Sequence, residues 1–390
     1  MNRMRKEVSP VVAVVGILVT LAVVQLLYWR GLVVRPTIPS RASPPGGGST
    51  GMQELPPDKS GVVVSTLAGQ PEPGYQDGPA EEARFDGPAG IAVAPGGTAP
   101  AGLIYVADGR NHRLRTVAAG GSVSTLAGGS AATLLGGYAD GPAAEARFAG
   151  PTGLALAPGG AILVSDTGNH RIRRVGPDGL VTTYAGAETP KDDLGRPQGG
   201  YRDGPAGEAE FRYPAGLAVD TAGNVYVADE GNRCVRRISA AGEVTTVAAA
   251  GEMGAPTYVA VTADGRLWVA DTAGGTLWVG PREGPLRRWE PAAGEQAPKA
   301  PAGLAARGDR LYVVDTAGNR LVCVEGGRVL PLAGDPEGGE AGYADGPGSH
   351  ARFSGPAALA AGADGSLYLA DFGNNCVRRV TLPARFEEGR

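Results

Sequence analysis

The chain has 390 residues, of which 64 are glycine and 32 are proline, and its net charge is −4. Seven basic and three acidic residues precede residue 61, so the rest of the chain carries a net charge of −8. A phosphate backbone is bound by clustered lysine and arginine, so this acidic balance excludes nucleic acid from the expected partners.

The first predicted element is a membrane helix. Residues 11–28 contain no charged residue, and as an α-helix they would span about 27 Å, close to the hydrocarbon thickness of a bilayer. Arg3, Arg5 and Lys6 precede this run, and a short basic N-terminus on a first helix usually stays in the cytoplasm. We therefore predict a cytoplasmic segment at 1–10, a single transmembrane signal anchor at 11–29 and a Pro/Gly/Ser-rich linker at 30–60.

A cleaved signal peptide is the competing interpretation of the same run. No A-x-A-like site follows it, because the sequence continues Tyr28-Trp29-Arg30. Either interpretation exports the rest of the chain. We expect a single-pass protein of the cell membrane whose following domain is periplasmic or extracellular.

Residues 61–382 contain one pattern six times. A first apolar run begins near residues 88, 151, 214, 256, 301 and 356, as in PTGLALAP. An alternating run ending in Asp follows, such as ILVSD, and then a Gly/Asn turn, a third run such as HRIRRV and, in most units, a fourth such as VTTYAG. Short alternating runs bounded by turn residues predict β-strands, and four strands repeated six times predict an all-β, six-bladed β-propeller.

The pattern resembles the NHL repeat family, most closely at residues 151–175 (PTGLALAPGGAILVSDTGNHRIRRV). The resemblance itself implies a six-bladed propeller. Four units carry an insert before the first strand, of the form GYxDGxxxxARFxxP in three of them and, in the third unit, with Glu210 in place of the arginine. This insert resembles NHL units of bacterial and plant proteins. These inserts occupy residues 74–88, 137–151, 200–214 and 342–356, and the fourth and fifth units lack them.

The sixth unit ends after its third strand, at Leu382, and residues 383–390 form a C-terminal tail. Its missing fourth strand is present at the other end of the domain, where VVVSTLAG at residues 62–69 matches VSTLAG at 123–128. We predict that this N-terminal strand pairs with the last blade and closes the ring. Closure removes two open sheet edges, so we expect a monomeric propeller.

Candidate binding residues lie in the inserts. Connections from the fourth strand to the next first strand leave a blade on the same side as its strand 2–3 turns, which favours this top rim as the binding face. Phe85, Phe148, Phe211 and Phe353 are expected to anchor the inserts in the core. The candidates for ligand contact are Tyr75, Arg84, Tyr138, Arg147, Tyr201, Tyr343, His350 and Arg352. For the three arginines, a salt bridge with a neighbouring blade is the favoured alternative.

An aspartate ends the second strand of every unit. One interpretation is a carboxylate ring for a cation such as Ca²⁺, formed by Asp108, Asp166, Asp229, Asp271, Asp315 and Asp371. The favoured interpretation is that each carboxylate accepts backbone N–H groups in its own turn, since a feature of every blade serves every blade. We therefore predict no metal or cofactor, with Ca²⁺ as the alternative.

The fourth unit is the least regular. It holds Trp268, Trp278 and Trp289, and Gly275 stands where other units have Asn. Tryptophan is enriched at interfaces, although core packing is the favoured interpretation here.

Two classes of function fit the sequence. The anchor, the linker and the absence of a nucleophile elbow, an H-E-x-x-H motif or a P-loop favour a non-catalytic binding module for a protein, peptide or glycan. The resemblance leaves open a metal-dependent lyase or lactonase with a site in the central channel. Members of the amidating-lyase type use several channel histidines, whereas this chain has three histidines in all.

Overall fold

The computed structural model describes residues 60–95, 102–129, 136–248 and 253–386. The predicted anchor and nearly all of the linker lie outside these residues. In the part of the chain that the structure does describe, no helix is long and apolar enough to cross a membrane.

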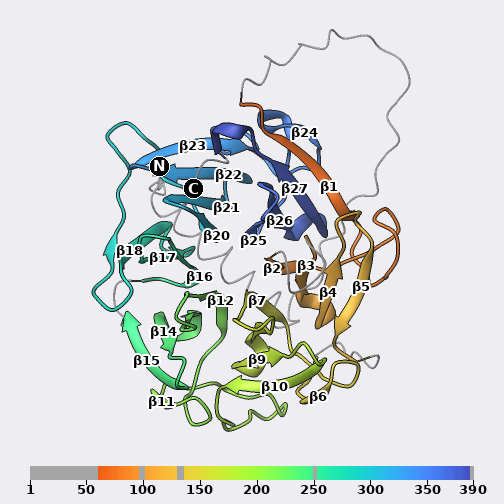
Figure 1. The fold of residues 1–390 in the computed structure, drawn as a ribbon, viewed down its shortest axis with the longest axis vertical. Helices are drawn as coiled ribbons and strands as arrows, with labels where there is room; N and C mark the ends of the chain where they lie inside the picture. Colours follow the sequence, from red (N-terminus) through yellow and green to blue (C-terminus); the bar gives the residue numbers. More distant parts are fainter. Residues whose placement is uncertain (1–59, 96–101, 130–135, 249–252, 387–390) are drawn as a thin grey trace, which may run out of the picture. The chain divides into compact units, whose positions relative to one another are not determined.

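The described residues form six antiparallel sheets arranged as blades around a ring, which confirms the predicted all-β propeller (Figure 1). The first strands of successive blades contact one another, and the ring closes where β2 contacts β25. Blade one consists of β2 (Pro88–Val93), β3 (Ile104–Asp108), β4 (Arg113–Val117) and β5 (Val123–Ala127). Blade two consists of β7 (Pro151–Leu156), β8 (Ile162–Asp166), β9 (Arg171–Val175), β10 (Leu180–Ala185) and β6 (Gly141–Pro142).

Blade three consists of β12 (Pro214–Val219), β13 (Val225–Asp229), β14 (Cys234–Ile238), β15 (Glu243–Ala248) and β11 (Gly204–Pro205). Blade four consists of β16 (Pro256–Val261), β17 (Arg266–Asp271), β18 (Thr276–Pro281) and β19 (Arg287–Arg288). Blade five consists of β20 (Pro301–Arg307), β21 (Arg310–Asp315), β22 (Arg320–Glu325) and β23 (Arg328–Ala333). Blade six consists of β25 (Ala358–Ala361), β26 (Leu367–Asp371), β27 (Cys376–Thr381), β1 (Val63–Gly69) and β24 (Gly346–Pro347).

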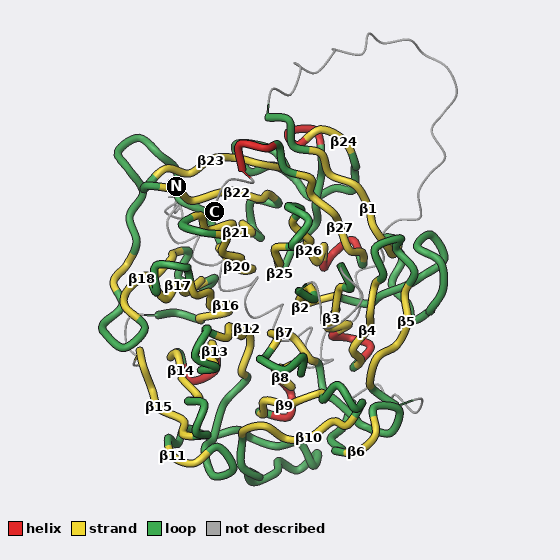
Figure 2. The backbone as a smooth tube through the Cα atoms, viewed as in Figure 1, coloured by secondary structure: helices red, strands yellow, loops and turns green. Residues whose placement is uncertain are grey.

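Short 3₁₀ helices form the turns between the second and third strands of blades one, two, three and six, and two further ones lie in loops of blade six (Figure 2). They are η1 (Gly109–Asn111), η2 (Thr167–Asn169), η3 (Glu230–Asn232), η4 (Gly348–His350), η5 (Phe372–Asn374) and η6 (Ala384–Phe386). The hydrophobic core lies between neighbouring blades, in five clusters of buried side chains. Both faces of a blade pack against neighbours, which explains why the second strands are apolar on both sides.

The N-terminal strand closes the ring as predicted. β1 pairs antiparallel with β27, with Val64 opposite Val380. Val62 and Val64 are buried in the core between blades five and six, whereas Val63 faces solvent. The first described strand of the propeller therefore completes its last blade.

The inserts run along the outer edge of their own blades rather than gathering on the top rim. β6, β11 and β24 are insert segments, and each pairs with the fourth strand of its blade near the start of that strand. In blade one a bridge between Gly78 and Val123 takes the same place. Figure 2 shows these loops at the circumference of the ring. Blades four and five have no such cover.

Candidate functional site

The aspartates that end the second strands are separate structural groups. Each is at most 1% exposed. Asp166 accepts the Ala149 N–H at 2.8 Å, the Asn169 side-chain N–H at 2.8 Å and a guanidinium N–H of Arg173 at 2.6 Å. The carboxylate is therefore bound within its own blade, but its backbone donor lies before the first strand and its own turn contributes the Asn169 side chain. Of the six aspartates, all in the described part of the chain, only Asp271 and Asp315 accept a backbone N–H of their own turn, from Gly274 and Gly318, so the expected turn contact is found in blades four and five. Among the described residues, no three His, Cys, Asp or Glu side chains lie close enough together to hold a metal ion.

A fully buried arginine on the third strand connects each insert to its blade. Arg173 donates to Asp166 on one side and, on the other, to Asp140 of the insert at 2.5 Å and to the Ala139 carbonyl at 2.7 Å. Asp140 also accepts the backbone N–H of Thr183, on the fourth strand, at 3.1 Å. The same arrangement recurs around the other buried arginines, Arg115, Arg236 and Arg378.

Burial shifts the titration of two groups in these turns. It raises the pKa of the Asp108 carboxyl to about 6, although the neighbouring Arg115 opposes the rise. It lowers the pKa of His170 to about 4. The Nδ1 atom of His170 accepts the Tyr213 N–H at 2.9 Å, and Nε2 lies 3.0 Å from the Pro197 carbonyl, so the neutral ring connects blade two to blade three.

The four predicted tyrosines are exposed but do not share a site. They lie on blades one, two, three and six and are between 44% and 56% exposed. The Tyr138 hydroxyl is 2.8 Å from the Thr183 hydroxyl of its own blade, and Arg171 lies over the ring at 4.2 Å. Tyr75, Tyr201 and Tyr343 make the corresponding hydroxyl contacts with Thr125, Thr246 and Thr66. The core positions predicted for Phe85, Phe148, Phe211 and Phe353 are confirmed.

The other insert candidates are also spread around the rim. The expected salt bridges of Arg84, Arg147 and Arg352 with neighbouring blades are absent among the described residues, so that prediction is wrong. Arg352 instead donates to the carbonyls of Ser349 and Ala351, each at 2.8 Å. The buried third-strand arginines make the ion pairs with the inserts, which is why these arginines are left outside them. His350 is half-buried at the end of η4.

The centre of the ring contains an aromatic side chain. At the third residue of the first strand, blades one, two, three and five have glycine, because neighbouring strands approach closely. A Cβ on Gly153 would lie 2.1 Å from the Ala215 carbonyl oxygen. Blade four has Tyr258 at this position, 6% exposed, with its hydroxyl beside the backbone of Ile91 in blade one, across the ring. That hydroxyl is buried without a hydrogen bond of good geometry.

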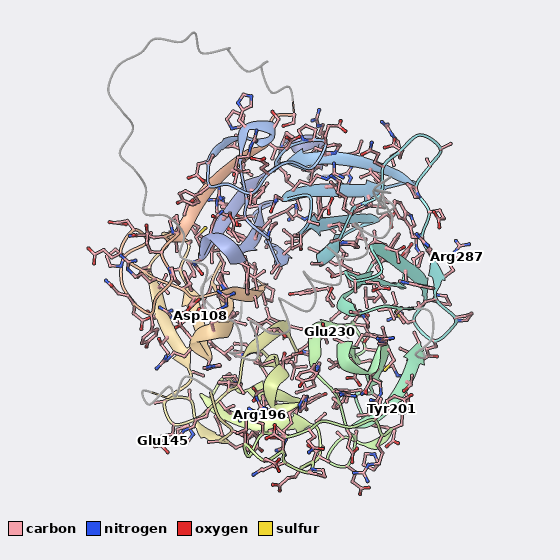
Figure 3. All side chains as sticks on the ribbon, turned by 180° about the vertical axis from the view of Figure 1, so that it is seen from behind. Asp108, Glu145, Arg196, Tyr201, Glu230 and Arg287 are labelled. Atoms are coloured by element: carbon pink, nitrogen blue, oxygen red, sulfur yellow. The ribbon has the colours of Figure 1, made fainter. Side chains whose placement is uncertain are left out.

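Glu230 is a second irregular residue near the centre (Figure 3). In blades two, four and five the residue after the strand-two aspartate is a threonine whose hydroxyl donates to a proline carbonyl of the next blade, as Thr167 does to Pro214 at 2.7 Å. Glu230 is half-buried, and the structure gives it no side-chain hydrogen bond or ion pair with any described residue. Burial raises its pKa to about 7. Only its departure from the repeat could have identified it from sequence.

Blade four has two open pockets at its outer edge. One, of about 600 Å³, is lined by Asp271, Gly274, Thr276, Trp278, Leu286, Arg287 and Arg288. The other, of about 480 Å³, lies between blades four and five, and its lining includes Arg287, Arg288, Trp268 and Trp289. Figure 3 places Arg287 at the rim of the ring.

The tryptophans at these pockets combine core packing with unused hydrogen-bond donors. Trp268 and Trp278 are 5% and 7% exposed, which confirms that they pack in the core. Within the residues that the structure describes, their indole N–H groups are buried without a hydrogen-bond partner. Sequence reasoning identified the irregular blade but not these donors, because whether an indole N–H finds an acceptor depends on contacts that a local pattern does not encode.

Comparison with known proteins identifies the repeat. The NHL repeat model matches residues 148–175 and 211–238. The chain is 34% identical over 100 residues to Protein SUPPRESSOR OF QUENCHING 1, chloroplastic, of Arabidopsis thaliana, and 38% identical over 94 residues to NHL repeat-containing protein 2 of Gallus gallus. These matches cover 25% and 24% of this chain, and 9% and 12% of the relatives.

Solved structures of similar fold have diverse names. An auxiliary nutrient binding protein of Bacteroides thetaiotaomicron matches with a TM-score of 0.61 at 14% identity, over 82% of this chain and 76% of that one. A streptogramin B lyase matches with a TM-score of 0.53 at 14% identity, over 83% and 98%. A gluconolactonase of Xanthomonas campestris matches with a TM-score of 0.54 at 15% identity, over 84% and 91%. At these identities the likeness shows the fold alone.

Proposed function

We propose that this six-bladed propeller with NHL repeats is a non-catalytic binding module, held outside the cytoplasm by the helix predicted at residues 11–29. The main support is the centre of the ring, where Tyr258 occupies the place that a channel ligand would need. His112 and His170 support it further. Their Nδ1 atoms accept backbone N–H groups of the next blade, each at 2.9 Å, which is a structural use of the ring.

The names of similar folds agree with a binding role without deciding it. Auxiliary nutrient binding proteins of two Bacteroides species share the architecture with TM-scores of 0.61 and 0.60. Lyases and gluconolactonases share it as well. We give more weight to the binding role because the buried aspartates and two of the three histidines form hydrogen bonds within the protein.

A lyase or lactonase is the second candidate, and Glu230 is the observation that favours it. A half-buried carboxyl without a partner in the described part of the chain, with its pKa raised to about 7, can donate or accept a proton at neutral pH. Such an enzyme would lose its activity in the Glu230→Gln variant, whereas binding of a partner at the rim would not change.

Capture of partners by the full-length chain tests the binding role. The chain is solubilised from membranes in mild detergent, immobilised by a C-terminal tag and incubated with envelope proteins and glycans. Saturable retention of one component, repeated with purified material, supports the proposal. Stoichiometric zinc or calcium in the purified chain, together with turnover of a lactone or lyase substrate, would overturn it.

The orientation is tested separately by adding protease to intact cells. We expect cleavage in the linker at residues 30–60 and release of the propeller. Where an outer membrane is present, the protease is added after that membrane has been opened. Protection while the cytoplasmic membrane is intact, with cleavage only after its lysis, would show that the propeller is cytoplasmic.

A further inference from the structure

Blade two shows what an insert does at the outer edge of a blade. Arg173 on β9 pairs with Thr183 on β10, and both donate to the Asp140 carboxylate of the insert. The insert carboxylate is therefore held by a buried cation from the third strand and by N–H and hydroxyl groups from the fourth. Blades one, three and six hold their insert carboxylates in the same way.

Blade four has hydrogen-bond donors at the same two positions, supplied by other residues, but it lacks the insert. Trp278 lies opposite Val269, as Arg173 lies opposite Val164, so Trp278 occupies the position of the buried arginine. Arg288 pairs with Trp278 and so occupies the position of Thr183. An indole N–H and a guanidinium thus stand where the insert carboxylate would be held.

The space that an insert fills in blade two is open in blade four. The pocket of about 600 Å³ is lined by Trp278, Arg287, Arg288 and the turn residues Gly274 and Thr276. The Trp278 N–H is buried without an acceptor among the described residues, although a buried donor without a partner costs about 1–3 kcal/mol. An acceptor supplied by a ligand would remove this cost.

The charge around the pocket favours an anion. Arg287 is exposed, and the structure gives it no ion pair with a described residue, whereas Arg288 has one exposed partner, Glu290, at 3.3 Å. Asp271 also lines the pocket, but it is 1% exposed and accepts the N–H groups of Gly254, Ala255 and Gly274. The unsatisfied groups that face the pocket are therefore donors and cations.

Blade five serves as an internal comparison. It also lacks an insert, but Val322 occupies the position of the buried arginine and Pro331 the position of Thr183. Neither side chain can donate a hydrogen bond. The loss of an insert alone therefore does not produce the donors, which are specific to blade four.

We propose that the outer edge of blade four binds an acidic peptide segment of a partner protein. The segment lies along β19, where the other blades have their inserts, and one carboxylate accepts hydrogen bonds from Trp278 Nε1 and Arg288. A peptide fits better than a glycan because the chain's own inserts show the form that such an edge accepts, a tight turn bearing one aspartate. This inference rests on the proposed binding role and specifies the site and the chemistry of the partner.

Tryptophan fluorescence provides a direct assay. Three of the four tryptophans belong to blade four. The probe is a synthetic peptide with the sequence of residues 137–151 (GYADGPAAEARFAGP), titrated into the full-length chain in detergent. We expect a saturable change in emission. The same peptide with Asn in place of its aspartate should bind at least about tenfold more weakly, because a charge-assisted hydrogen bond is lost.

Variants of the chain locate the site. Arg287→Glu/Arg288→Glu should weaken binding of the peptide at least about tenfold, and Trp278→Phe should also weaken it. The control is Arg202→Glu/Arg212→Glu, which makes the same change in net charge at exposed positions of the blade-three insert and should leave binding unchanged. Equal unfolding temperatures of the variants would show that each one is folded.

Three results would overturn the inference. They are equal binding of the aspartate and asparagine peptides, unchanged binding to Arg287→Glu/Arg288→Glu, and binding of polygalacturonate at this site in place of the peptide. If a partner captured by the full-length chain also binds Arg287→Glu/Arg288→Glu normally, the binding role stands and this site fails. If no partner is captured and a substrate is turned over, the proposed function itself fails.

Discussion

Replacing Arg173 with methionine tests whether the buried arginines hold the inserts on the blades. The side chain is fully buried and makes hydrogen bonds to Asp166, to Asp140 and to the carbonyls of Ala139 and Arg147. Methionine fills much of the volume but donates nothing. Asp166, which is 0% exposed, would then be a buried carboxylate without its cation.

We expect Arg173→Met to lower the free energy of unfolding by about 3–5 kcal/mol, the usual cost of removing one partner of a buried ion pair. For a domain of roughly 320 residues this corresponds to a fall of about 6 °C in the unfolding temperature. The assay is thermal unfolding followed by circular dichroism, together with hydrogen exchange at residues 137–151. Exchange should rise first in the insert, because Arg173 is its main link to the blade.

Two further variants make this prediction specific. Arg174→Met changes the neighbouring half-buried arginine and should alter stability by no more than about 0.5 kcal/mol. Arg173→Met/Asp166→Asn should be more stable than Arg173→Met alone, because the uncompensated charge is also removed. If the unfolding temperatures of Arg173→Met and Arg174→Met agree within the experimental error of about 1 °C, the buried arginine does not hold the insert.

Three other predictions follow from the same structure. Deleting residues 61–69 removes all of β1 and should lower the unfolding temperature of the whole propeller by more than about 10 °C, whereas unfolding like the parent would disprove closure by this strand. Glu230→Gln should raise the free energy of unfolding by about 1–2 kcal/mol at pH 8 but not at pH 4, because a carboxyl whose pKa is raised to about 7 destabilises the fold as it ionises. The control Glu208→Gln, at an exposed position, should show no such difference between the two pH values. His170 acts in the opposite sense, because burial lowers its pKa to about 4. Its neutral form stabilises the fold above pH 6.5, and up to about 3 kcal/mol of that stability is lost on acidification towards pH 4. In His170→Asn, the free energy of unfolding should therefore vary less between pH 6.5 and pH 4.

The repeat made most of the fold predictable. Six copies in register fixed the strands of each blade, and the match between residues 62–69 and 123–128 identified the strand that completes blade six. These inferences depend on local patterns of alternating residues and turns, which have the same meaning in every unit. The core positions of the insert phenylalanines followed for the same reason.

The path of the inserts was less accessible, although the sequence contained a signal for it. The insert precedes the first strand, so the sequence suggested a loop on the top rim. The structure brings Asp140 to Arg173, on the third strand of the same blade. The four units with an insert all have this arginine, and the two units without one have Trp278 and Val322 instead. That covariation within one chain indicates the contact.

The residues near the centre of the ring depend on contacts between distant units. Tyr258 reaches the backbone of Ile91 only because blades four and one lie opposite each other. The raised pKa of Glu230 depends on how many atoms surround a half-buried side chain. Neither property is encoded in a local pattern, and the sequence shows only that both residues depart from the repeat.

Those departures have opposite effects at the two ends of blade four. At the inner end, Tyr258 replaces a glycine and reaches across the ring to the backbone of Ile91, and at the outer end Trp278 replaces an arginine beside an open pocket. Each leaves a buried donor without a partner, which costs about 1–3 kcal/mol. The ordinary repeat avoids both costs, as blade two shows with Gly153 and Arg173. Departures that cost stability tend to mark functional sites, and here one places an aromatic side chain across the ring while the other lies beside an open pocket at the rim. We therefore look for the ligand of this propeller at the edge of blade four.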